Sequence, residues 1–186
     1  MSDDKPKLDN DTQFKRVLGS TISAWNMVED GLGDVFCALF GSINHLAARN
    51  AYLAVINFNA RMNMVEASAA AALLSDDLLS ECKTLLGRAG KKSGIRNKLT
   101  HFSRVNHKLP SGERAICLVP NFWTGDEWAK SMEGRGHAWT WPEVAEFGNQ
   151  FSTLAIKLTQ LARKIEEHRQ KQPLKFPQST FAQPRA

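Results

Sequence analysis

This chain has few cysteines: Cys37, Cys82 and Cys117 lie far apart, and no CxxC pair is present. An odd number of widely spaced cysteines argues against a disulfide framework and favours reduced thiols. Long apolar runs are missing as well, because the longest run of small apolar residues, 67–74, is far too short to span a bilayer. The polar residues 1–10 do not resemble a secretory signal peptide. We therefore expect a cytoplasmic protein with no membrane association.

Several catalytic motifs are also missing. The sequence contains no Gly-rich phosphate loop of the Walker type and no serine-elbow motif. His107 and His137 have no cysteine or carboxylate at ligand spacing, so a zinc site is not expected. We find no internal repeat. The sequence predicts no metal and no cofactor.

Acidic residues are absent from one segment, 82–112, although the chain as a whole carries 19 of them against 24 Lys and Arg. The net charge of +5 is smaller than the charge of this segment alone, so the remainder of the chain is close to neutral. Such a concentrated basic patch predicts an anionic partner such as a phosphate. Its eight basic residues are Lys83, Arg88, Lys91, Lys92, Arg96, Lys98, Arg104 and Lys108.

Apolar residues recur at spacings of three and four over most of the chain, which predicts amphipathic helices. The first helix should begin at a cap formed by Asp11 or Thr12 and end before Gly41. The second should run from about 43 or 46 to 74. The last should start at the capping box formed by Thr140 and Glu143.

The middle of the chain is less regular. Ser75 and two aspartates predict the start of a short third helix, after which Gly87, Gly90 and Gly94 predict a Lys-rich loop. A further short helix is expected over 93–102. Beyond it, 105–108 and 115–119 predict two short strands joined by a turn, followed by an irregular excursion over 121–139.

These elements predict an all-α fold, an up-and-down bundle of about four to five helices with a small irregular or β-hairpin insertion before the last helix. The helical domain should cover 12–168, with the insertion at 103–139. Residues 1–11 should form a disordered tail, and the Pro- and Gln-rich residues 169–186 a flexible one.

The basic segment contains the sequence Arg96-Asn97-Lys98-Leu99-Thr100-His101. On a helix Asn97 and His101 share a face, so the amide is expected to orient the imidazole. Arg96 lies about 140° away around the helix and would have to reach towards the same cleft with its long side chain. A base that takes a proton from a 2′-hydroxyl and a cation that stabilises a phosphorane are what RNA transesterification uses, without a metal.

An arginine followed by a polar residue, with a histidine four to six positions further on, is the signature of the HEPN superfamily, and Arg96, Asn97 and His101 match it. The helix order around the motif fits as well, so the chain resembles this superfamily over roughly 12–168. The resemblance implies a metal-independent endoribonuclease, of the kind found among toxins of toxin–antitoxin systems and defence proteins. It also implies a homodimer with both motifs in one cleft, and an antitoxin as a possible further partner.

Each of these residues also has a structural interpretation. Arg96 could pair with Glu29 or Asp30 on the first helix, and His101 could cap a helix end. Glu29 could be an accessory group that pairs with Arg96 or tunes His101, although a surface or interface position is the simpler interpretation. The tryptophans are expected to pack the insertion onto the bundle rather than to stack on bases. They are Trp123, Trp128, Trp139 and Trp141.

A second function stays open from the sequence alone. The same fold could bind RNA or a nucleotide without cleaving it, or act as a dimeric protein-interaction module. Other basic residues near the motif are candidate RNA contacts of lesser weight, although a Lys-rich stretch is often only a solvated face. These candidates are Arg88, Lys91, Lys92, Lys98 and Arg104.

Overall fold

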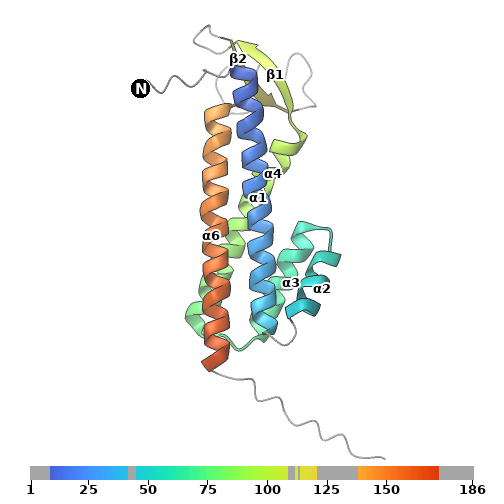
Figure 1. Ribbon diagram of the computed structural model, residues 1–186, viewed down its shortest axis with the longest axis vertical. Helices are drawn as coiled ribbons and strands as arrows, with labels where there is room; N and C mark the ends of the chain where they lie inside the picture. The colour runs from blue at the N-terminus through green and yellow to red at the C-terminus, as the bar shows by residue number, and fades with distance from the viewer. Residues whose placement is uncertain (1–8, 42–44, 109–111, 113, 121–137, 172–186) are drawn as a thin grey trace, which may run out of the picture.

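The computed structural model describes residues 9–41, 45–108, 112, 114–120 and 138–171, with backbone alone at 107 and 108. This part of the chain forms an all-α bundle with a small antiparallel sheet before the last helix, as predicted (Figure 1). The helices are α1 (Asn10–Phe40), α2 (His45–Ala54), α3 (Phe58–Ala71), α4 (Asp76–His101) and α6 (Trp141–Lys171). The strands are β1 (Ser103–Lys108), β2 (Arg114–Val119) and β3 (Trp139–Thr140).

The centre of the bundle is the pair α1 and α6, which run side by side in the same direction, while α4 runs antiparallel behind them (Figure 1). Two glycines let the pair approach closely. A Cβ on Gly31 would lie 3.0 Å from the Cβ of Leu158, and one on Gly148 would lie 2.9 Å from Oγ1 of Thr21. The helices α2 and α3 pack as a short pair beside the C-terminal half of α1 (Figure 1).

The predicted second helix is wrong as a single element, because the chain forms α2 and α3 with a break at 55–57. The break is held by local hydrogen bonds. Asn57 caps α3 by accepting a bond from the amide of Ala60 at 3.1 Å, and Nε of Arg61 donates to the carbonyl of Val55 at 2.5 Å. An asparagine cap stabilises a new helix start even where the apolar spacing continues through it.

The predicted loop at 87–92 is also wrong, since α4 continues through Gly87, Gly90 and Gly94 to His101 as one helix of 26 residues. Leu85, Ala89 and Leu99 are buried, so the apolar face continues past the glycines. Tertiary packing of such a face stabilises a helix more than intrinsic propensity destabilises it. The predicted cap at Ser75 is confirmed, because its hydroxyl accepts the amide of Leu78.

The predicted hairpin is confirmed. The strands β1 and β2 pair antiparallel from Ser103 opposite Val119 to Lys108 opposite Arg114, and the unpredicted β3 adds to β2. The sheet covers the end of the bundle where α4 ends (Figure 1). The α6 capping box is present as well, since the amide and hydroxyl of Thr140 donate to the Glu143 carboxylate at 2.8 and 2.7 Å. The excursion predicted for 121–139 falls mostly outside the described residues.

The outer helix ends differ from the predicted ones by a few residues. Asp9, rather than Asp11 or Thr12, caps α1, and its carboxylate accepts the amides of residues 11 and 12 at 2.9 Å. The bonds from Thr12 hold the pKa of the Asp9 carboxyl below its usual value. At the other end α6 extends to Lys171. In the described ranges, no helix combines the length and the apolar character needed to cross a membrane.

Candidate functional site

The motif occupies the last two turns of α4. Arg96 follows the fully buried Ala89 by seven residues, which places it close to the face that α4 turns towards the core. Yet the arginine does not enter the core. It lies half-buried at the edge of a surface pocket of about 390 Å³ that α1, α3 and α4 enclose. Residues that line this pocket are Trp25, Glu29, Ile56, Asn57, Phe58, Asn59, Ser93, Arg96 and Asn97.

No acidic side chain in the described part of the chain pairs with Arg96. Its Nη1 donates instead to Oδ1 of the neighbouring Asn97 at 3.2 Å. Glu29 instead forms an ion pair with Arg61, in which Nη1 of Arg61 lies 2.9 Å from Oε2 of Glu29. Asp30 pairs with Arg49, whose Nη2 lies 3.6 Å from Oδ1 of Asp30. The interpretation of Arg96 as a structural ion-pair partner of helix α1 is therefore wrong for both acids. A guanidinium without an acid, at the edge of a polar pocket, is well suited to hold an anion.

Glu29 shapes the pocket without contacting the motif. Its carboxylate also accepts a hydrogen bond from Nε1 of Trp25 at 2.6 Å, so both of its oxygens are occupied. Its backbone carbonyl accepts the hydroxyl of Tyr52 at 2.9 Å. Glu29 therefore ties α1 to α2 and α3 beside Arg96.

His101 is the last residue of α4 and is exposed. The predicted contact between Asn97 and His101 is not found, because within the described residues no hydrogen bond reaches the imidazole and Asn97 contacts Arg96. His101 also lies outside the pocket that Arg96 lines. In a single chain the cation and the histidine therefore face different directions, as their separation of about 140° around the helix requires.

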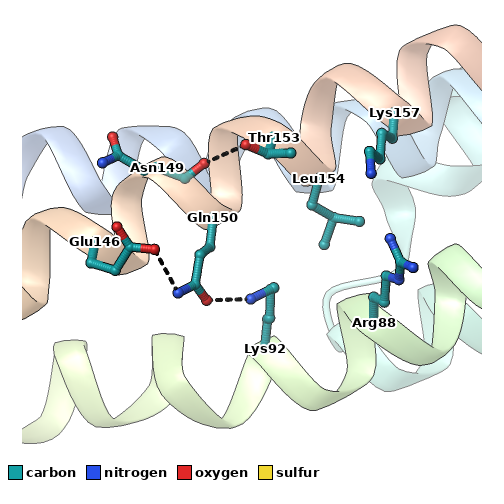
Figure 2. Close-up of a pocket in the computed structure, with 8 residues that line it drawn as sticks. All are labelled: Arg88, Lys92, Glu146, Asn149, Gln150, Thr153, Leu154 and Lys157. Atoms are coloured by element: carbon teal, nitrogen blue, oxygen red, sulfur yellow. Dashed lines mark hydrogen bonds between the residues drawn. The ribbon is translucent and has the colours of Figure 1, made fainter.

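The other predicted basic contacts do not form one surface. Arg104 is ion-paired with Asp11 of α1. Nζ of Lys98 lies 5.9 Å from the ring centroid of Trp139, within cation–π range. Lys91 is exposed. Arg88 and Lys92 line a different hollow, a groove between α4 and α6 (Figure 2).

The aromatic residues that the structure describes beside the motif serve packing. Trp139 stacks on Phe102 at a centroid distance of 5.2 Å and meets Phe147 edge-on at 4.8 Å. It thereby attaches the sheet to α4 and α6, as the sequence predicted. Trp141 is 38% exposed at the start of α6. Trp123 and Trp128 lie outside the described residues.

The cysteines are poor candidates for a nucleophile. All three are free and buried, and burial raises the pKa of each thiol, that of Cys82 to about 11. Within the described ranges, no three His, Cys, Asp or Glu side chains gather in a way that could hold a metal ion. The side chains of His107 and His137 lie outside those ranges.

Sequence reasoning missed the groove between α4 and α6. Lys157 of α6 faces Arg88 across it, and Gln150 bonds to Lys92 (Figure 2). The helical periodicity of α4 and α6 was visible in the sequence, but their relative register was not.

Comparison with protein-family models, with curated proteins and with solved structures finds no match to this chain. The chemistry of the site must therefore be argued from its own residues.

Proposed function

We propose that this protein is a metal-independent endoribonuclease in which Arg96, Asn97 and His101 act on an RNA phosphodiester, as the HEPN-like motif implies. The observation that carries the proposal is the guanidinium of Arg96, which has no acidic partner among the described residues and lies on a polar pocket at the end of the basic helix α4. A cation that the fold leaves unneutralised is available to a substrate phosphate.

The reaction needs a base, a proton donor and a stabilised phosphorane. In the proposed step His101 takes the proton of the RNA 2′-hydroxyl and the 2′-oxygen attacks the phosphorus. The bond from phosphorus to the 5′-oxygen of the next nucleotide then breaks, and the protonated imidazole gives its proton to that oxygen. The products are a 2′,3′-cyclic phosphate and a 5′-hydroxyl. Arg96 stabilises the charge that develops on the phosphorane oxygens, and Asn97 holds the guanidinium through the bond at 3.2 Å.

The divergence of Arg96 and His101 within one chain supports a homodimer as the active form. A second copy whose α4 end faces the first would place His101 of one chain near Arg96 of the other. Light scattering of the purified protein at micromolar concentration should then give twice the mass of the chain. A monomer at that concentration would contradict the shared cleft.

Cleavage is tested with single-stranded and structured RNA in the presence of EDTA. Wild-type protein should cleave and leave 2′,3′-cyclic phosphate ends. His101→Ala should lower kcat by about 10²- to 10⁴-fold because the base is lost. Arg96→Ala should lower it by about 10²- to 10³-fold because the phosphorane loses its cation.

Matched controls are His45→Ala and Arg16→Ala, which remove an exposed histidine and an exposed arginine elsewhere in the chain. Both controls should cleave like the wild type. Absence of cleavage by wild-type protein, or equal cleavage by His101→Ala, would refute the catalytic proposal. Growth arrest on expression that Arg96→Ala abolishes would point to a toxin or defence effector acting in the cytoplasm.

A second candidate function is an RNA- or nucleotide-binding module without catalysis. It is favoured by the hydrogen bond of Asn97 to Arg96 in place of His101, which leaves the imidazole unoriented. Such a module should bind RNA with an affinity that falls steeply with salt, and should not turn it over. A chain that ignores RNA and binds another protein would be an interaction module instead.

A further inference from the structure

A groove of about 220 Å³ lies between α4 and α6, and none of the residues that line it also lines the Arg96 pocket. Three basic side chains converge on it: Arg88 and Lys92 from α4 and Lys157 from α6 (Figure 2). Glu146 is the one acid among the described residues that line the groove, and it lies at the end opposite Arg88 and Lys157 (Figure 2). The groove is therefore a basic cleft with its charge concentrated at one end.

The contacts between α4 and α6 elsewhere differ in charge from those at the groove. Two turns further along the seam, Lys164 of α6 meets Glu81 of α4 in an ion pair at 2.9 Å. Lys157 precedes Lys164 by seven residues on α6, and Arg88 follows Glu81 by seven residues on α4. Since the helices are antiparallel, the position equivalent to the ion pair is occupied by two cations, which point towards one another (Figure 2).

Neither cation has an acidic partner among the described residues. Two like charges held across a groove repel each other, and an anion between them relieves the repulsion. An acid in place of Arg88 would have repeated the ion pair of the next turns. Two cations that face each other with no acid between them are the arrangement that an anion site uses.

Lys92 is held in place by the polar residues of α6. Its Nζ donates to Oε1 of Gln150 at 2.6 Å, and Nε2 of Gln150 donates to Oε1 of Glu146 at 3.0 Å. This chain of bonds occupies the acid at the far end of the groove. It leaves Lys92 with further donors to offer to a ligand beside Arg88 and Lys157.

The size of the groove decides what fits. Its volume is several times the share of one water in the liquid, about 30 Å³, and below the range of about 300–1,000 Å³ that encloses a whole small molecule. A phosphate group with part of its hydration fits inside it, while the rest of a nucleotide would lie outside the groove. We propose that Arg88, Lys92 and Lys157 form a phosphate site in the groove between α4 and α6, which takes a backbone phosphate of a bound RNA strand.

The affinity of the groove for phosphate stands by itself, whereas its assignment to RNA rests on the proposed function. A strand whose backbone lies in the groove would continue around α4 towards the motif. The proposed RNA surface thus includes Lys157 and Gln150 of α6, which lie outside the basic segment 82–112.

Binding is measured by fluorescence anisotropy of a labelled single-stranded RNA on the full chain in EDTA, in the His101→Ala background so that cleavage does not interfere. Arg88→Gln and Lys157→Gln should each weaken binding about tenfold, because each removes a charge-assisted contact to phosphate. Each should also lower the slope of log affinity against log salt by about 0.7. Lys83→Gln and Arg163→Gln remove exposed cations from the same two helices outside the groove and serve as controls.

The variant Arg88→Glu distinguishes a groove that binds phosphate from one in which Arg88 and Lys157 face each other without binding a ligand. The substitution creates an ion pair with Lys157 like that of Lys164 with Glu81, so the melting temperature should rise by about 1–3 °C. RNA affinity should nevertheless fall further than in Arg88→Gln. Gain of stability with loss of RNA binding supports the site; unchanged RNA affinity in Arg88→Glu and Lys157→Gln overturns it.

A second experiment distinguishes free phosphate from the phosphate of an RNA backbone. It compares the melting temperature of the wild type in inorganic phosphate with that in chloride at equal ionic strength. Protection that Lys157→Gln removes, together with weakened RNA binding, supports the full proposal. Protection by phosphate with no RNA binding at all supports the site and overturns its assignment to RNA. Weakened RNA binding by the groove variants in a protein that never cleaves RNA supports the groove while the proposed catalysis fails.

Discussion

At the scale of the residue, the candidate site depends on which carboxylates are already occupied. Glu29 is the nearest acid on the wall of the Arg96 pocket, yet Arg61 and Trp25 hold both of its oxygens. The Arg61 side chain is 15% exposed and also lies 5.1 Å from the ring centroid of Tyr52. Because Glu29 pairs with Arg61, Arg96 has no acidic partner among the described residues and stays available for the proposed role.

This arrangement predicts a stability effect for Glu29→Gln. The substitution keeps the shape of the side chain but leaves the guanidinium of Arg61 half-buried without a charged partner. The free energy of unfolding should fall by about 1–3 kcal/mol. Urea denaturation measures it, with Glu167→Gln as the control on an exposed carboxylate of α6, expected to stay within about 0.5 kcal/mol. Equal stability of the two variants would show that the Arg61 pair contributes nothing.

At the scale of the element, α4 is the decisive helix because it carries both the motif and one side of the proposed phosphate groove. Its glycines suggested a loop, whereas the buried face through Leu85, Ala89 and Leu99 keeps it helical. A loop there would have separated Arg88 and Lys92 from Arg96. The continuous helix instead fixes both basic surfaces on one rod, with Lys92 one turn before Arg96.

Gly87→Ala and Gly94→Ala test this continuity. A Cβ at either position would meet nothing within 4 Å, so each substitution should raise the free energy of unfolding by about 1 kcal/mol through helix propensity. Gly90→Ala should gain less, because its Cβ would lie 3.2 Å from Cε of Met62. Thermal unfolding measures the series. Failure of both Gly87→Ala and Gly94→Ala to stabilise would favour the loop.

At the scale of the whole molecule, the parallel pair of α1 and α6 sets the positions of everything else. The helices approach closely where Gly31 meets Leu158 and where Gly148 meets Thr21. Thr21 is buried, and its hydroxyl donates to the carbonyl of Val144 at 3.0 Å. Because α4 packs against α6 and lies beside α1, the register of this pair determines where the pocket and the groove form.

Gly148→Ala should therefore destabilise the bundle. The added methyl would lie 2.9 Å from Oγ1 of Thr21, so this hydroxyl must move and its hydrogen bond to the carbonyl of Val144 is weakened or lost. We expect a loss of about 1–3 kcal/mol in the free energy of unfolding, measured by urea denaturation. Gly19→Ala on α1 is the matched control, since its Cβ would meet nothing within 4 Å and should be neutral or stabilising. A neutral Gly148→Ala would mean that the pair tolerates a wider spacing.

The sequence by itself determined the features that depend on near neighbours along the chain. Helical spacing predicted the bundle class, Ser75 and the Thr140–Glu143 box marked helix starts, and two short strands around a turn marked the hairpin, because caps, turns and periodicities act within a few residues. Tertiary structure alone decided the continuity of α4, the pairing of Glu29 with Arg61, and the approach of Arg88 to Lys157. Most of these depend on which faces of distant helices meet and in which register, which no local pattern encodes.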